Sequence, residues 1–226
     1  MIIEAPFVDA VTARVDFFEA HFRVHRTKCA ALTYPAPLPT SVAGIFGALC
    51  GWERRLDGPP KEAESLLFGA KIVSHGGICR ELATYKETPK NVRGVAPIIL
   101  INEPRYLIAM AGEGVEQWYK LLSGGSFHYL PYGGQSWFFP KDIGDFRLKI
   151  ASETKEIESY APKDFVEDIR MGRDGSIQML PVVHNFSVDE MFYFVEKDVK
   201  LILRHKLPSV EGIGLYSLRD FRWVAG

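Results

Sequence analysis

The spacing of hydrophobic residues changes from an alternation to a helical period early in the chain. Between residues 13 and 22, apolar Val15 and Phe17 alternate with polar neighbours, which predicts a strand with one face in the core. Over residues 40–55 the spacing becomes three and four, which predicts a helix that ends before the Gly-Pro-Pro turn at 58–60. The apolar stripe of this helix comprises Val42, Ile45, Phe46 and Leu49.

The later pattern predicts mostly strands. We expect strands at residues 71–74, 78–86, 97–102, 105–110, 146–158 and 191–204, and a second helix at 114–122. The runs 97–102 and 105–110 predict a hairpin, and the polar residues 84–94 a basic hairpin excursion. The order indicates an α+β fold, a ferredoxin-like (RRM-like, split βαβ) domain over residues 1–145. A smaller β-rich C-terminal extension, residues 146–226, is expected to pack on it.

Composition narrows the class of protein without selecting a function. The chain has 47% hydrophobic and 24% charged residues, which are ordinary globular values. No run reaches the roughly 18 apolar residues of a membrane span, and residues 1–11 do not resemble a signal peptide. Cys29, Cys50 and Cys79 are widely spaced without a CxxC pair, which disfavours disulfides and structural zinc. We therefore expect a cytoplasmic protein that contacts no membrane and holds no metal.

Charge is balanced overall but uneven along the chain. The formal net charge of -1 argues against binding nucleic acid by bulk electrostatics alone. Acidic residues are concentrated between residues 142 and 168, whereas two earlier segments are basic. This asymmetry fits one face on RNA and another facing solvent or protein, and it equally fits ordinary solvated charges. The basic residues are Arg23, Arg26, Lys28, Arg54 and Arg55, then Lys71, Arg80, Lys86, Lys90 and Arg93.

A proline-rich turn precedes the first predicted helix. Pro35, Pro37 and Pro39 favour an extended backbone over residues 34–38. Thr40 or Ser41 is then predicted to be the N-cap of the helix, because a side-chain oxygen can accept from the free amides of the first turn. The same amides attract phosphate. The basic segment, the turn and the helix together suggest a nucleic-acid site.

Two blocks of the sequence resemble a known family. The first is AHFR followed by TYPAPLPTSVAGIFGALCG, within residues 20–51, and the second is YLPYGGQSWFFPKDI at residues 129–143. Both blocks resemble the fifth Cas protein family. These are the RAMP-superfamily, CRISPR-associated subunits that cap the 5′ handle of crRNA in type I Cascade complexes, and the variant most similar to this chain is that of type I-B.

This resemblance implies a non-catalytic RNA-binding subunit of an antiviral defence ribonucleoprotein that needs no cofactor. Such a subunit would hold the crRNA 5′ handle, link the Cascade backbone subunit to the large subunit, and meet target DNA through the complex. A thumb-like hairpin, expected at residues 84–94, would insert over the crRNA. Cations would contact phosphates, aromatic rings would stack on bases, and glycines would admit the RNA backbone. The expected RNA-binding residues are Arg23, His25, Arg26, Lys28, Tyr34, Thr40, Ser41, Lys86, Lys90, Arg93, Gly133, Gly134, Gln135 and Ser136.

Two alternatives stay open. The type I-C branch of the same family resembles this chain in architecture and cleaves precursor crRNA without metal, using a tyrosine, a lysine and a histidine. Tyr34, Lys28 and His25 provide these residue types, but the adjacent Lys and His of that branch are missing from the middle of this sequence. This difference favours a chain that is not an enzyme. The second alternative is a protein adaptor with incidental RNA contact, built on apolar residues such as Phe138 and Phe139.

Overall fold

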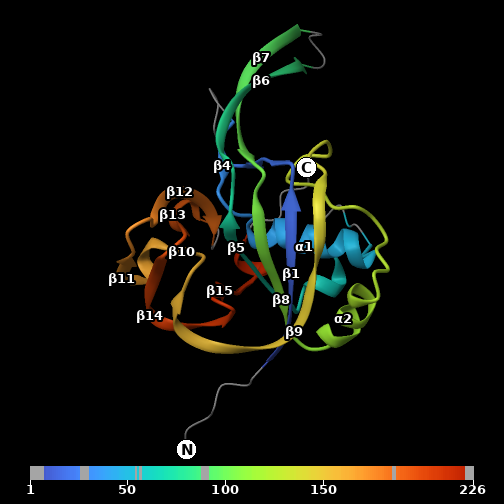
Figure 1. Ribbon diagram of the computed structural model, residues 1–226, viewed down its shortest axis with the longest axis vertical. Coiled ribbons are helices and arrows are strands. Elements are labelled where there is room, and N and C mark those ends of the chain that lie inside the picture. Colours follow the sequence, from blue (N-terminus) through green and yellow to red (C-terminus); the bar gives the residue numbers. More distant parts are fainter. Residues whose placement is uncertain are drawn as a thin grey trace, which may run out of the picture.

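An eight-stranded antiparallel sheet forms the body of the molecule in the computed structural model, which describes residues 8–25, 31–53, 55, 58–87, 92–184 and 187–221. Figure 1 shows the central strands of this sheet side by side. The strand order is β11 (Val166–Met171), β14 (Val199–Val210), β9 (Pro140–Ile157), β1 (Val8–Phe17), β8 (Arg105–Ala111), β5 (Leu67–Ser74) and β16 (Tyr216–Ser217), with β15 (Ile213–Gly214) paired to β14.

Three smaller sheets surround the large one. They comprise β10 (Tyr160–Pro162), β13 (Ser187–Glu196) and β12 (Ser176–His184); β2 (Glu19–Ala20), β7 (Val92–Asn102) and β6 (Gly77–Glu87); and β3 (Phe22–Arg23) with β4 (Thr33–Tyr34). The described residues also form two α-helices, α1 (Pro39–Cys50) and α2 (Val115–Ser123), and 3₁₀ turns at Lys61–Ala63, Lys163–Phe165 and Leu218–Asp220.

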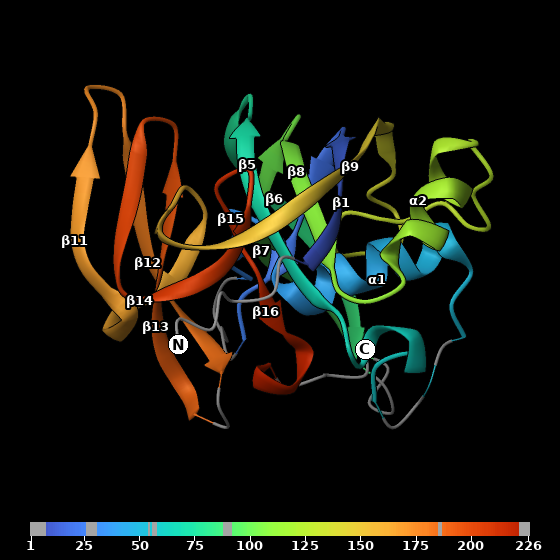
Figure 2. The ribbon, with the colours of Figure 1, turned by 90° about the horizontal axis from the view of Figure 1, so that it is seen from below.

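Strand β1 is the centre of the fold because it pairs with β8 on one side and β9 on the other. Val11, Ala13, Val15 and Phe17 of β1 are buried in the main core together with Phe46 of α1 and Leu122 of α2. Figure 2 shows α1 crossing one face of the central strands. On the opposite face, Ala10 lies in a second, smaller core that Val210, Ile213 and Leu215 cover.

Helix α1 begins earlier than the sequence predicts. Leu38 is the N-cap and Pro39 opens the helix, since a proline at the first position needs no hydrogen-bond partner for its nitrogen. The prediction that Thr40 or Ser41 is the N-cap is therefore wrong: both residues lie inside the first turn, and no side chain caps the helix. The helix ends at Gly51, whose φ of 73° is left-handed, well before residue 55.

The predicted fold class, a ferredoxin-like α+β domain with split βαβ order, is wrong. The described residues are mostly antiparallel sheet and include only two α-helices. The strands expected in a separate extension instead lengthen the central sheet, because β9 pairs with β1 and β14 pairs with β9. The division of the chain at residue 145 stays a prediction, and β9 runs through that residue without a break.

The predicted hairpin of residues 97–102 and 105–110 is also corrected. Both runs are strands, but β7 pairs with β6 and β2, whereas β8 pairs with β1 and β5. The turn between them contains Glu103 with a φ of 44°, and its backbone N–H donates to the Phe18 carbonyl. The tight turn therefore directs the chain from one sheet into another.

Gly69 is packed too closely for a side chain, which makes the contact between β5 and β15 testable. A Cβ at this position would overlap the carbonyl oxygen of Gly214, whereas a Cβ on Gly44 in α1 would meet no atom within 4 Å. We expect Gly69→Ala to lower the free energy of unfolding by about 1–3 kcal/mol through overpacking. Gly44→Ala should raise it by up to about 1 kcal/mol through helix propensity. Urea unfolding of both variants checks this, and equal stabilities would contradict the contact.

Candidate nucleic-acid interface

A two-stranded ribbon of β6 and β7 projects from the molecule, as Figure 1 shows. The strands pair continuously from Gly77–Asn102 at the root to Glu87–Val92 near the tip. Strand β2 holds the root by pairing with the end of β7. Ile78, Leu82 and Val95 are exposed on the ribbon, and the side chain of Leu82 is 70% accessible. Exposed apolar side chains on a projecting ribbon indicate a surface that contacts another molecule.

The predicted excursion at 84–94 is the distal end of this longer ribbon. Lys86 and Arg93 lie directly opposite each other in its register. Lys90 falls outside the described residues. Arg80, nearer the root, is exposed and lies opposite Ile99. The ribbon therefore brings together basic positions that are separated in the sequence.

A second exposed surface is the aromatic loop, which we define as residues 127–139 between α2 and β9. Tyr129 and Trp137 are 69% and 61% exposed. Of the aromatic residues exposed here, only Phe139 is predicted from the sequence as a surface residue, although the dense aromatic composition of YLPYGGQSWFF was a visible signal. Its other exposed large residues are Phe127, Leu130, Tyr132 and Phe139.

Gly133 and Gly134 attach the aromatic loop to the strand segment beside it. The Gly133 carbonyl accepts from the His21 backbone N–H at 2.8 Å, and Gly134 adopts a left-handed φ of 96°. A Cβ on Gly134 would overlap the His21 carbonyl oxygen. The backbone that approaches these two glycines is therefore that of the protein itself, at His21, and not that of an RNA strand. Of the two predicted neighbours, Gln135 is half-buried and Ser136 is exposed.

The aromatic loop and the ribbon flank the same short segment. Strand β2 pairs with β7 of the ribbon, and His21 directly after it bonds to the aromatic loop. Lys141, the second residue of β9, lies nearby with its ammonium 5.9 Å from the centroid of the Phe18 ring, which is a cation–π contact. An exposed apolar ribbon and an exposed aromatic loop suited to base stacking therefore flank the same segment.

The predicted basic segment is only partly described. Arg23 is exposed in β3 opposite Thr33, and His25 is half-buried. Arg26 and Lys28 fall outside the described residues. Thr40 and Ser41 are half-buried in the first turn of α1. Among the cations predicted to contact phosphate, Arg23 is the one whose side chain lies in the described part of the chain, and this side chain is exposed.

Tyr34 is a core residue rather than a surface aromatic. Its side chain is 2% exposed, its ring stacks on Phe194 with 5.5 Å between centroids, and its hydroxyl donates to the Pro181 carbonyl at 2.8 Å. Burial raises the pKa of this phenol to about 12. No ring face is left for an RNA base, so the expectation that Tyr34 stacks on one is corrected.

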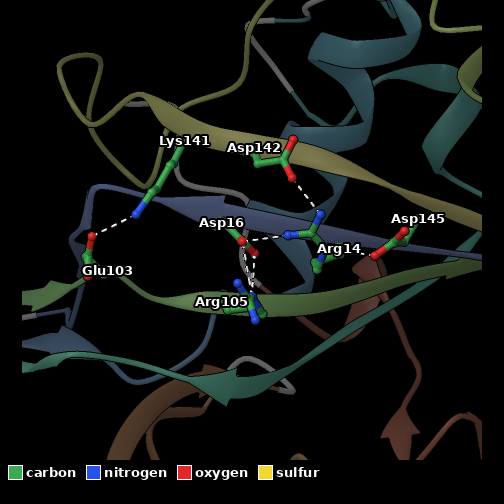
Figure 3. Close-up of polar contacts among 7 residues, drawn as sticks. All are labelled: Arg14, Asp16, Glu103, Arg105, Lys141, Asp142 and Asp145. Carbon is green, nitrogen blue, oxygen red and sulfur yellow. Dashed lines mark hydrogen bonds and ion pairs between the residues drawn. The ribbon is translucent and has the colours of Figure 1, made fainter.

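Much of the positive charge on the central strands is already neutralised. Figure 3 shows Arg14 of β1 surrounded by three carboxylates, at 2.6 Å from Asp16, 2.6 Å from Asp142 and 2.9 Å from Asp145. Hydrogen bonds to Asp145 and Asp142 raise the pKa of Arg14. Arg105 also contacts Asp16, at 3.1 Å, and Lys141 pairs with Glu103 at 2.8 Å. These cations are held by protein carboxylates, which makes this cluster a poor phosphate site.

Within the part of the chain that the structure describes, no group of three or more His, Cys, Asp or Glu side chains is arranged to hold a metal ion. Among the same residues, no helix has the length and apolar character needed to cross a membrane.

His21 lies at the root of the ribbon and makes stability depend on pH. Its buried ring donates from Nδ1 to the Ile99 carbonyl at 2.8 Å, and burial lowers its pKa below the ordinary value of 6.5. The unfolded chain therefore binds this proton first as pH falls. We expect unfolding free energy to decrease below about pH 6.5, by up to about 1.4 kcal/mol per pH unit.

Denaturant titrations at pH 7 and pH 5 measure this loss. His21→Asn keeps a donor for Ile99 without a titrating ring, so it should lose less stability than the parent protein over the same interval. Equal pH dependence in the two proteins would assign the effect to other groups.

Comparisons with known proteins extend the description of the fold. No family model and no curated protein matches this sequence. A chain in a solved structure described as a CRISPR RNA-guided surveillance complex is 15% identical, with a TM-score of 0.51, over 88% of this chain and 91% of that chain. A crystal structure described as a Cas protein is 12% identical, with a TM-score of 0.44, over 86% and 95%. The chain therefore shares its fold with a chain of a CRISPR RNA-guided surveillance complex.

Proposed function

We propose that this chain is a non-catalytic subunit of a type I CRISPR effector complex, most like that of type I-B, and that it binds the 5′ handle of crRNA. The observation that carries the proposal is the placement of the ribbon and the aromatic loop on either side of β2 and His21. The shared fold with a chain of a CRISPR RNA-guided surveillance complex supports it. So does the resemblance of residues 20–51 and 129–143 to the fifth Cas family.

In this proposal the two surfaces bind RNA in complementary ways. Unstacked bases of the handle lie on Tyr132 and Trp137 of the aromatic loop, because stacking on aromatic rings tolerates any base. Arg23 and Arg80 contact phosphates, and the ribbon inserts over the strand. Other faces bind the backbone subunit and the large subunit, and target DNA is reached through the assembled complex.

The burial of Tyr34 favours binding over cleavage. A tyrosine that assists RNA cleavage must reach the 2′-hydroxyl or the leaving oxygen. The Tyr34 hydroxyl is instead bonded to Pro181 inside the core, and burial stabilises its protonated form. The proposed subunit therefore holds crRNA that another protein has processed.

Removing exposed rings tests the aromatic loop. We expect Tyr132→Ala combined with Trp137→Ala to weaken binding of handle RNA at least about tenfold, since each stacked base contributes about 1–3 kcal/mol. Fluorescence anisotropy with labelled handle RNA and the purified chain measures the affinity. Phe165→Ala, which removes an exposed ring outside the aromatic loop, serves as the matched control. Unchanged affinity in the double variant would overturn the assignment of this surface.

Incubation with repeat RNA tests the absence of catalysis. We expect the purified chain, in EDTA, to leave its own CRISPR repeat RNA intact. Site-specific cleavage that depends on His25 or Lys28 would replace the proposed role with that of a metal-independent processing enzyme. The readout is a denaturing gel of end-labelled repeat RNA over several hours.

A further inference from the structure

A cavity of about 240 Å³ opens at the root of the ribbon. It lies where the ribbon meets β4, β5 and the β12–β13 sheet, so four segments distant in sequence form its walls. Its volume is below the roughly 300–1,000 Å³ of pockets for drug-sized ligands, which suits a single base or a single side chain. Its apolar walls include Leu32, Ile72, Ile78, Ile99, Ile101 and Leu180.

One carboxylate interrupts these apolar walls. Glu196 lines the cavity and is only 8% exposed. His75 fixes its orientation: Nδ1 of the ring accepts from the Gly77 N–H at 3.0 Å, so the proton lies on Nε2, which donates to Glu196 Oε2 at 3.0 Å. Within the described part of the chain, Glu196 Oε1 forms no hydrogen bond. The cavity therefore presents a strong, oriented hydrogen-bond acceptor in apolar surroundings.

This chemistry selects what can enter. A phosphate would be repelled by the carboxylate, and an entirely apolar group would leave it unpaired. A flat ring with an amino group satisfies both the apolar walls and the acceptor. Adenine, cytosine and guanine carry exocyclic amino groups, whereas uracil offers a carboxylate only its N3–H, which two carbonyl oxygens flank. Gln178 also lines the cavity and adds a second polar partner.

The surroundings of the cavity provide a path for an RNA strand. Thr33 lines it, and the exposed Arg23 lies directly opposite Thr33 in the β3–β4 pair, where it can hold the phosphate of an entering nucleotide. On the ribbon, Ile78, Arg80 and Leu82 are every second residue of β6 and therefore share one face. The cavity wall continues outward along this face as an exposed strip.

We propose that this cavity binds one unstacked RNA base through its amino group, with Glu196 as the acceptor and His75 as the residue that positions the carboxylate. The inference rests on the proposed RNA-binding function and gives it a base preference. An amino-bearing base is preferred over uracil, because the two carbonyl oxygens beside the uracil N3–H would lie close to the carboxylate.

Affinities for four short RNAs test the preference. The purified full chain is titrated with labelled octauridylate and with the same strand carrying a single central A, C or G. We expect at least one amino-bearing strand to bind about tenfold more tightly than octauridylate, in line with the discrimination of a good base contact. Glu196→Gln keeps the His75 bond and adds a donor for uracil, so it should reduce this difference to less than about threefold.

Two further variants keep the test independent of folding. Glu153→Gln changes an exposed carboxylate of β9 outside the cavity and should keep the full preference. Leu180→Phe, at a half-buried position on the wall outside the ribbon, should fill the cavity and erase the preference while binding of octauridylate persists. Circular dichroism of each variant verifies that it is folded.

The outcomes separate this inference from the proposed function. Tight binding of all four RNAs without preference, unchanged by Glu196→Gln, would overturn the base pocket and leave the RNA-binding role intact. Failure of the parent protein to bind any of the strands or its handle RNA would overturn the role itself. If Glu196→Gln instead releases the chain from nuclease-treated complex, the cavity holds a cationic side chain of a partner subunit, and the base pocket is wrong.

Discussion

A buried stack of tyrosines around Phe194 holds the N-terminal segment against the C-terminal strands, and the rest of the structure depends on it. Tyr34 and Tyr160 both pack on Phe194, with ring centroids 5.5 Å and 5.4 Å away, and Tyr216 stacks on Tyr160 at 5.8 Å. Burial raises the pKa of all three phenols, which therefore stay protonated as donors. Each tyrosine ring thus packs against another aromatic ring, and each hydroxyl has a hydrogen-bond acceptor. The hydroxyls donate to the carbonyls of Pro181, Pro37 and Tyr160, respectively.

This stack also determines where the candidate surfaces lie. Tyr34 immediately precedes the prolines, and the bond from Tyr160 to the Pro37 carbonyl fixes the extended turn that leads into α1. Thr33, one residue before, is thereby placed over the cavity and opposite Arg23. A contact in the core therefore orients the edge at which RNA is proposed to bind. Loosening the stack would move the cavity walls relative to the ribbon.

The sequence predicts local elements well and long-range pairings poorly. The strand around Val15 and both helices are confirmed as elements, because each has a clear apolar period, although the strand covers Val8–Phe17 rather than residues 13–22. The pairing of residues 97–102 with 105–110 is wrong because proximity in the chain says nothing about which sheet a strand joins. Tyr34 lies between a polar segment and prolines, where no period indicates which way its ring points. Apart from Phe139, the exposed rings of the aromatic loop were not predicted as a surface, because aromatic residues usually indicate a core.

The distribution of charge explains why aromatic and apolar contacts are prominent at the proposed interface. The net charge is -1, and Arg14, Arg105 and Lys141 on the central strands are held by carboxylates, so these three cations are poorly available to a polyanion. Affinity for RNA then has to come from few phosphate contacts and from surfaces that bases can enter or stack upon. In the proposed role, such a surface would distinguish an ordered, unstacked strand from bulk duplex nucleic acid, since only the former presents free base faces. The proposed base pocket would add to this selectivity, because Glu196 repels phosphate and can accept from a base amino group.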